Sequence, residues 1–135
     1  MKKTIRKIKI YLILTITALI FSSSLFASHY MGGEITWECL SNGQYIFTMK
    51  VYRECNGIQF NAIETLTVLN NPSVTSIDMT RISQIDISPQ CNTIGPQITC
   101  ATVTAPNQGA VEEQIYQSAP ITLAGVPPAQ GWIFC

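Results

Sequence analysis

Short stretches in which apolar and polar residues alternate run along the chain from about residue 33 to its end. They are rich in Ile, Val, Thr, Tyr and Phe, and turn-forming pairs such as Asn42-Gly43 and Pro127-Pro128 separate them. No helical period extends over more than a turn or two. The pattern predicts an all-β fold, an immunoglobulin-like antiparallel β-sandwich. The expected strands cover 33–40, 44–53, 62–69, 73–79, 83–88, 97–104, 111–117, 119–124 and 131–135.

The side-chain pattern also sets the register of the first hairpin. A two-residue turn would pair apolar positions of one strand with polar positions of the other, whereas a three-residue loop over 41–43 keeps each face uniform. This loop places Gly43 where φ must be positive. The expected cross-strand pairs are Ile35 with Met49, Trp37 with Phe47, and Cys39 with Tyr45.

The N-terminal segment has the order of a secretory signal peptide. Five of the eight basic residues fall within 1–9, the 12 residues 10–21 form an apolar run that only two threonines interrupt, and a small and polar stretch ends at Ala27. A transmembrane helix needs about 20 apolar residues, so this run is too short. We expect a signal-peptide helix over 1–27, followed by one exported module over 28–135 that reaches the periplasm and then the cell surface or the medium.

The charge distribution excludes one large class of partners. After residue 9 the chain holds three basic and eight acidic residues, a net charge of −5. Such a surface cannot neutralise several phosphates, so we expect no nucleic acid as a partner. Contact with a membrane is expected only through the transient signal peptide.

Five cysteines lie in the expected mature part, and export makes disulfides their default role. Cys91 and Cys100 bracket a short loop and are the expected pair. Cys39 lies near the turn of the first hairpin and Cys55 beyond its open end, roughly 30 Å apart at ~3.3 Å per residue, so these two are not expected to pair. The pairing of Cys135 is left open, as are the actual partners of Cys39 and Cys55.

The odd cysteine is the last residue, in the run Trp-Ile-Phe-Cys. We interpret the chain as truncated at its C-terminus; the alternative is a free or intermolecular thiol.

The sequence offers no catalytic constellation. Glu112 and Glu113 are adjacent and would point to opposite faces of a strand. Glu34 and Glu38 share the outer face of the first hairpin, with Lys50 and Arg53 nearby, which is typical of a solvated, charge-balanced surface. No catalytic residue, cofactor or metal site is predicted, although a calcium site built from scattered carboxylates is left open.

Four aromatic residues could form a ligand platform instead of a core. Aromatic side chains on strands of a small sandwich are usually buried, but a row of them on one exposed face would suit a sugar. The candidates are Trp37, Tyr45, Tyr52 and Trp132.

Several motifs together resemble one family. Residues 28–39 (SHYMGGEITWEC) are followed by 43–45 (GQY) and 51–57 (VYRECNG), and later by 89–91 (PQC), Cys100, 111–116 (VEEQIY) and 127–132. They look like the N-terminal module of large exported proteins of the Bacteroidetes group, many of them gliding-motility-associated or adhesin-like. The resemblance covers essentially all of 28–135.

This resemblance implies a β-sandwich-like module at the start of a long multidomain protein with a C-terminal sorting domain read by the type IX secretion system. The family's module usually continues into a Cys-Cys-Arg-Asn stretch, which would offer partners for Cys55 or Cys135. It has no catalytic residues to carry over. The expected function is that of a noncatalytic cell-surface or secreted module with an adhesive or structural role; the alternative is a carbohydrate-binding module of a secreted multidomain enzyme. Expected partners are downstream domains of the same polypeptide, extracellular glycans or surface proteins.

Overall fold

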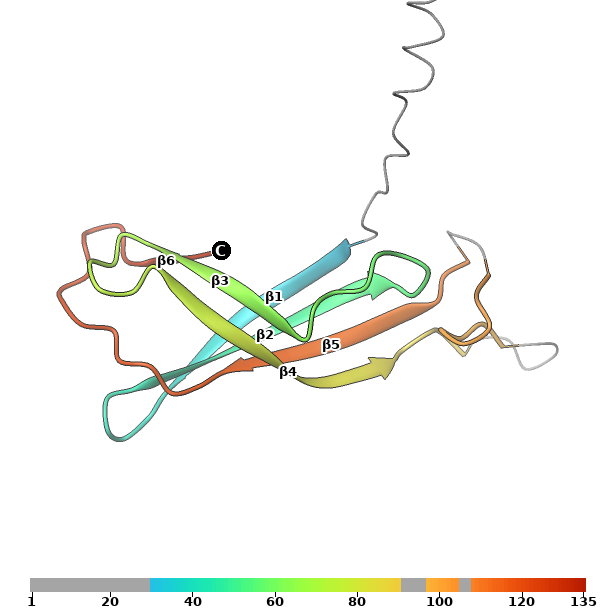
Figure 1. Cartoon of the computed structure of the whole chain (residues 1–135), viewed down its shortest axis with the longest axis horizontal. Helices are drawn as coiled ribbons and strands as arrows, with labels where there is room; N and C mark the ends of the chain where they lie inside the picture. The colour runs from blue at the N-terminus through green and yellow to red at the C-terminus, as the bar shows by residue number, and fades with distance from the viewer. Residues whose placement is uncertain (1–29, 91–96, 105–107) are drawn as a thin grey trace, which may run out of the picture.

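The computed structural model describes residues 30–90, 97–104 and 108–135, so the predicted signal peptide lies outside the described residues. Six strands form one antiparallel sheet in the order β1-β2-β5-β4-β3-β6 (Figure 1). None of the described residues forms a helix with the length and hydropathy that a bilayer crossing requires. The strands are β1 (Tyr30–Cys39), β2 (Tyr45–Glu54), β3 (Ile63–Leu69), β4 (Ser76–Asp86), β5 (Val111–Ser118) and β6 (Ile133–Phe134).

The register predicted for the first hairpin is confirmed. Leu40 N–H donates to the Gln44 carbonyl over 2.7 Å and closes a loop over 41–43. Gly43 in this loop has a φ of 79°, a conformation that glycine adopts without a steric penalty. The cross-strand partners are Ile35 with Met49, Trp37 with Phe47, and Cys39 with Tyr45.

Strand β4 makes the sheet curl. The stretches 73–79 and 83–88, expected as two strands, contribute to this single strand, whose first half pairs with β3 and whose second half pairs with β5. Its register with β5 shifts between Arg81 and Ser83, and a β-bulge of this kind bends a strand and increases its twist. In consequence β6 packs against β2, where the rings of Phe47 and Phe134 are 4.6 Å apart.

The hydrophobic core fills the inside of this curl. Every second residue of a strand faces it, which gives the period-2 pattern of buried positions in β3 (Leu66, Val68) and β4 (Ile77, Met79). The all-β antiparallel class is therefore confirmed, with the described strands hydrogen-bonded into one curled sheet. The buried core cluster consists of Phe47, Val51, Leu66, Val68, Ile77, Met79 and Tyr116.

Two expected strands do not form. In 97–104, Thr99 N–H donates to the Thr102 hydroxyl over 2.9 Å, and such local side-chain bonds compete with pairing into a sheet. The stretch 119–124 contributes only an isolated bridge between Ile121 and Tyr45. The last expected strand, 131–135, is reduced to the two residues of β6.

Candidate functional site

An open groove of about 300 Å³ lies beside the turn end of the first hairpin, and its lining is almost entirely aromatic. We call it the aromatic groove. Three of the four aromatic residues singled out in the sequence line it, and they come from β1, β2 and the segment before β6. Its lining residues are Trp37, Tyr45, Phe47, Leu123, Trp132 and Phe134.

Trp37 is the most accessible of these aromatic rings. It lies opposite Phe47 in the register of β1 and β2, yet Phe47 is 1% exposed and Trp37 is 65% exposed. The difference arises because Phe134 packs on Phe47, whereas Trp37 lies on the edge strand of the sheet. The prediction that such aromatic residues are usually core therefore fails for Trp37.

The floor of the aromatic groove is held by backbone contacts and carries one unused donor. Tyr45 and Ile121 exchange two backbone hydrogen bonds of 2.8 and 2.9 Å, which fix the segment after β5 against β2. The indole Nε1–H of Trp132 is buried and has no hydrogen-bond partner among the described residues. Among the described residues, no carboxylate or basic side chain lines the groove.

Tyr52, the fourth candidate, lies on the other face of the sheet. It pairs with Glu113 of β5. It shares its face with Lys50, because the two residues are two positions apart along β2. Lys50 Nζ is 3.5 Å from Glu34 and 3.9 Å from Glu113. The expected charge-balanced outer face is thus present around Lys50.

Arg53 does not belong to that outer face, contrary to expectation. It is 4% exposed, and its Nε donates to Glu112 Oε1 over 2.9 Å. Glu112 and Glu113 do point to opposite faces, as their adjacency predicted. The alternation along the strand could have indicated this orientation. Arg53 is two residues from Val51 and four from Met49, and both of these side chains lie on the inward face of β2.

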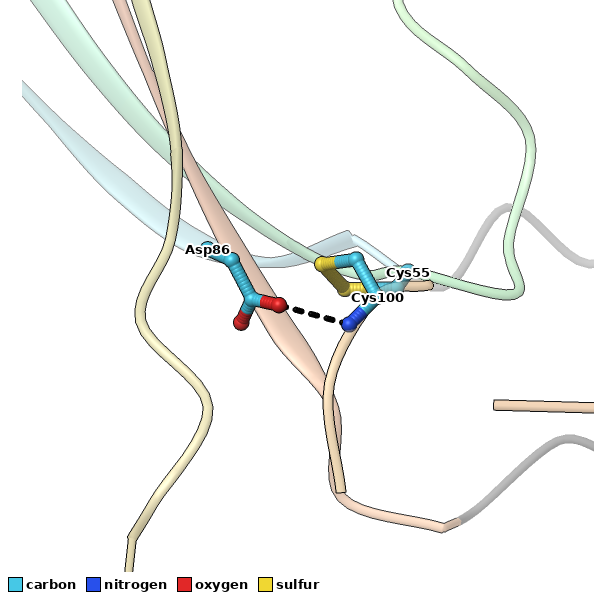
Figure 2. A group of neighbouring side chains, drawn as sticks. All are labelled: Cys55, Asp86 and Cys100. Atoms are coloured by element: carbon cyan, nitrogen blue, oxygen red, sulfur yellow. Dashed lines mark hydrogen bonds between the residues drawn. A yellow bond between two sulfur atoms is a disulfide. The ribbon is translucent and has the colours of Figure 1, made fainter. Parts of the chain in front are cut away.

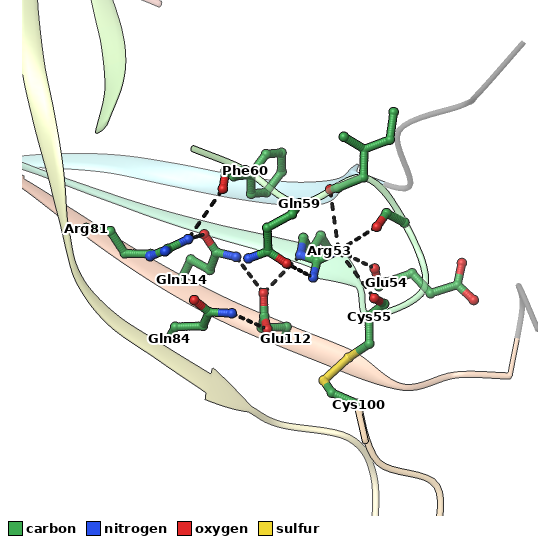
Figure 3. Close-up of polar contacts among 12 residues, drawn as sticks. Arg53, Glu54, Cys55, Gln59, Phe60, Arg81, Gln84, Cys100, Glu112 and Gln114 are labelled. Carbon is green, nitrogen blue, oxygen red and sulfur yellow. Dashed lines mark hydrogen bonds and ion pairs between the residues drawn. A yellow bond between two sulfur atoms is a disulfide. The ribbon is translucent and has the colours of Figure 1, made fainter. Parts of the chain in front are cut away.

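The buried pair lies in a network of polar side chains at the open end of the hairpin (Figure 3). Arg53 donates through Nη1 to the carbonyl oxygens of Glu54 and Gly57 over 3.1 and 2.9 Å, and through Nη2 to the Gln59 side chain. It thereby fixes the connection between β2 and β3. Gln84 Nε2 donates to the second oxygen of Glu112 over 2.7 Å.

Hydrogen bonds decide the protonation of the Glu112 carboxyl. Burial alone would raise its pKa, but donors from Gln114, Gln84 and Arg53, together with the charge of Arg53, bring the pKa below its usual value. A carboxylate with this many protein donors is a poor general base and a good structural anchor. We assign Glu112 the structural role.

The network continues to the core through Gln114, which is fully buried. Its Oε1 accepts from Arg81 over 3.2 Å and lies 2.6 Å from the hydroxyl of Tyr116. Burial raises the pKa of Tyr116, and the charge of Arg81 opposes this. The inside of the curled sheet is therefore apolar at one end and polar at the other.

One disulfide braces the same end of the molecule. Cys55 is bonded to Cys100, with Cα atoms 5.0 Å apart and a sequence separation of 45. Cys100 is thus bonded to Cys55 and not to Cys91, the partner expected from the sequence, and Cys91 itself lies outside the described residues. Cys39 and Cys55 are not paired, as expected, and Cys39 and Cys135 are free and exposed.

The pairing of Cys55 with Cys100 follows from contacts that no local pattern shows. Cys55 N–H donates to the Ala110 carbonyl over 3.0 Å, just beyond the pairing of β2 with β5. Asp86, at the end of β4, accepts from Cys100 N–H over 2.6 Å (Figure 2). Three strand ends therefore meet at this disulfide.

The same three residues form a group of metal-ligand type, with ligand atoms within 4.8 Å of one another. The two sulfurs are bonded to each other, so neither is a thiolate ligand. Asp86 also accepts from the Ser88 amide and hydroxyl. The Ser88 hydroxyl lowers the pKa of Asp86, burial opposes it, and the amides of Ser88 and Cys100 lower it further. The group thus braces the loop after β4.

No family model, no curated protein and no solved structure matches this chain. The interpretation of function therefore depends on the geometry above and on the motifs of the sequence.

Proposed function

We propose that this chain is a noncatalytic binding module of an exported protein, displayed at the cell surface or secreted, and that the aromatic groove is its contact surface. The observation that carries this proposal is the exposure of Trp37 beside Tyr45 and Trp132, since large exposed apolar patches mark interaction sites. In contrast, Glu112 is held by structural hydrogen bonds. The resemblance to N-terminal modules of surface proteins supports export and an adhesive role, and favours a sandwich-like module in which β1-β2-β5 and β4-β3-β6 act as two layers.

A carbohydrate-binding role is the second candidate, and the aromatic groove favours it. An indole ring that is 65% exposed presents a flat apolar face, and the C–H face of a sugar ring is a suitable partner for it. The unpartnered Nε1–H of Trp132 would be available to a sugar hydroxyl after a small movement of the ring. Few charged groups are needed for this type of recognition, and the described lining of the aromatic groove carries none.

Affinity electrophoresis tests the carbohydrate candidate. The full oxidised chain would be run in native gels that contain xylan, mannan or mixed-linkage β-glucan. We expect retardation by at least one polysaccharide, loss of that retardation in Trp37→Ala, and no change in Tyr52→Ala, which removes an aromatic ring from the opposite face. Absence of retardation in all three gels would count against glycans.

The binding-module proposal itself is tested by adhesion. Beads coated with the wild-type chain or with Trp37→Ala would be counted on glass coated with polysaccharide or with extracellular protein. Fewer attached Trp37→Ala beads on either surface would support the groove as a contact surface. Equal attachment of both kinds of bead on every surface would refute it.

A further inference from the structure

Three side chains of metal-ligand type meet beside the loop after β4, at the open end of the first hairpin. The Sγ atoms of Cys55 and Cys100 and a carboxylate oxygen of Asp86 all lie within 4.8 Å of one another (Figure 2). In the oxidised chain the two sulfurs are bonded to each other. Reduction of this bond leaves two thiols and a carboxylate in one place, a set of ligand atoms that suits a soft or borderline metal ion.

Contacts other than the disulfide hold the backbones of these residues in place. Cys55 N–H donates to the Ala110 carbonyl over 3.0 Å, and Arg53 Nη1 donates to the Cys55 carbonyl over 3.4 Å. Cys100 N–H donates to Asp86 Oδ2 over 2.6 Å. None of these hydrogen bonds involves a sulfur atom. The proximity of the three side chains therefore does not depend on the S–S bond alone.

The ligand atoms need only a small rearrangement to surround an ion. In a tetrahedral zinc centre with Zn–S near 2.3 Å and Zn–O near 2.1 Å, the ligand atoms are about 3.6–3.8 Å apart. After reduction, a rotation about χ1 of either cysteine separates the two sulfurs. Cys100 lies in the segment 97–104, which forms no strand, so a small shift of its backbone would disturb no strand pairing.

The carboxylate of Asp86 has room for one more partner. A carboxylate offers about four acceptor positions. Oδ1 of Asp86 accepts from the amide and the hydroxyl of Ser88, and Oδ2 accepts from the Cys100 amide. The described donors thus use three positions, and the fourth is on Oδ2, the oxygen beside Cys100. Asp86 is exposed and both cysteines are half-buried, so a reductant and an ion can reach the group.

We propose that Cys55, Asp86 and Cys100 form a zinc site that is available only when their disulfide is reduced. A dithiol reductant exchanges with the disulfide: it gives up two electrons and two protons and becomes a disulfide itself, while the two cysteines become thiols. Zn²⁺ then displaces the two thiol protons to solvent and binds both thiolates and Asp86, and a water molecule completes the tetrahedron. In the oxidised chain the disulfide braces this end of the module instead.

The chemistry of the three side chains selects zinc among the common metal ions. Ca²⁺ and Mg²⁺ take about six or more oxygen ligands, and the side chain of Asp86 is the one carboxylate of this group. Cu(I) favours soft sulfur ligands, whereas Zn²⁺ accepts thiolate and carboxylate together. Three anionic ligand atoms at this distance repel one another, and a divalent cation between them removes the repulsion. The aromatic groove lies at the turn end of the hairpin, so the inference does not depend on its proposed binding function.

Cobalt substitution tests the proposal, because thiolate-bound Co²⁺ has a charge-transfer band in the near ultraviolet and tetrahedral Co²⁺ has strong visible bands. The protein is the full chain with the changes Cys39→Ser, Cys91→Ser and Cys135→Ser, so that only Cys55 and Cys100 can supply thiolates. After reduction with a phosphine, we expect one equivalent of Co²⁺ to produce these bands and Zn²⁺ to abolish them, with no bands from the oxidised chain. Absence of the bands from the reduced chain, or equal bands from both forms, would overturn the proposal.

Two variants distinguish a three-ligand site from metal capture by two thiols. Asp86→Asn removes the carboxylate ligand, whereas Asp78→Asn removes another exposed carboxylate of β4. We expect Co²⁺ affinity at least about tenfold lower and shifted visible bands for Asp86→Asn, since even the loss of a group that orients a ligand costs about 10–100-fold. Asp78→Asn should change neither. Equal affinities of the two variants would overturn the assignment of Asp86.

Thermal unfolding followed by circular dichroism shows whether the folded chain is the form that binds the metal. An ion that binds the folded state stabilises it, so zinc should raise the thermal midpoint of the reduced chain and leave that of the oxidised chain unchanged. A midpoint of the reduced chain that zinc does not raise would mean that the thiols bind the ion in the unfolded state, and would overturn the proposal.

Discussion

Removal of the Cys55–Cys100 disulfide should strongly destabilise the end of the module where β2, β4 and β5 meet. The variant Cys100→Ser leaves a free thiol at Cys55 and opens a covalent loop of 45 residues. In the chain-entropy model, a loop of this length restricts the unfolded chain by about 13 cal/mol/K, which corresponds to about 4 kcal/mol at 25 °C. Small domains have only about 5–15 kcal/mol of stability in total, so a large part of this stability would be lost.

The assay is urea unfolding of the full oxidised chain, followed by tryptophan fluorescence. At a slope of about 1–3 kcal/mol/M, a loss of about 4 kcal/mol moves the midpoint down by roughly 1.3–4 M urea. Cys55→Ser should have the same effect, and the double variant should be no worse than either single one, because both remove the same bond. Cys39→Ser is the matched control, since its thiol is free and exposed, and its midpoint should not move.

If a variant fails to fold, peptide mapping of the wild-type chain under non-reducing conditions still tests the pairing. It should recover a fragment that links Cys55 to Cys100. Recovery of a Cys91–Cys100 fragment, for which the same model gives only about 2.6 kcal/mol over nine residues, would refute the pairing. So would midpoints for Cys55→Ser and Cys100→Ser that equal the wild-type value.

Three further predictions concern other parts of the fold. Arg53→Gln should lower the free energy of unfolding by about 3–5 kcal/mol, because it leaves the Glu112 carboxylate buried without its ion pair. Lys50→Gln on the outer face should lower it by less than about 1 kcal/mol. An equal loss in urea unfolding for both variants would contradict this. The pKa of Glu112 is lower in the folded than in the unfolded state, so its contribution to stability is fully present above the unfolded value near 4 and is lost as the pH falls through the folded value. Between about pH 7 and 2.5, the thermal midpoint should therefore fall less steeply in Glu112→Gln than in the wild-type chain. Parallel curves for the two proteins would contradict this prediction. Gly33→Ala would place a Cβ 2.5 Å from the Lys50 carbonyl oxygen and should cost about 1–3 kcal/mol, against less than about 0.5 kcal/mol for Thr36→Ala on the same strand, and an unchanged urea midpoint for Gly33→Ala would show that the backbone shifts freely there.

The aromatic groove could be predicted only in part from the sequence. Trp37, Tyr45 and Trp132 were candidates by residue type, and the structure brings them together although Trp132 is far from the others in sequence. Tyr52 was grouped with them by type, but the alternation along β2 places it on the opposite face. The exposure of Trp37 depends on its place on the edge strand and on the packing of Phe134 against Phe47, and the strand pattern contains neither.

Local chemistry determined the antiparallel all-β class and the register of the first hairpin. Both depend on side-chain alternation over a few neighbouring residues and on one glycine with positive φ at the turn, and these constraints act before any distant contact forms. Tertiary structure decided the rest: the bulge at Arg81 that joins two expected strands into β4, the burial of Arg53 against Glu112, and the pairing of Cys55 with Cys100. Each of these brings together residues distant in sequence. These contacts depend on the free energy of the whole packed sheet. In that sheet a buried charge is stable only beside a counter-charge, and a strand pairs with the edge that the curl brings next to it.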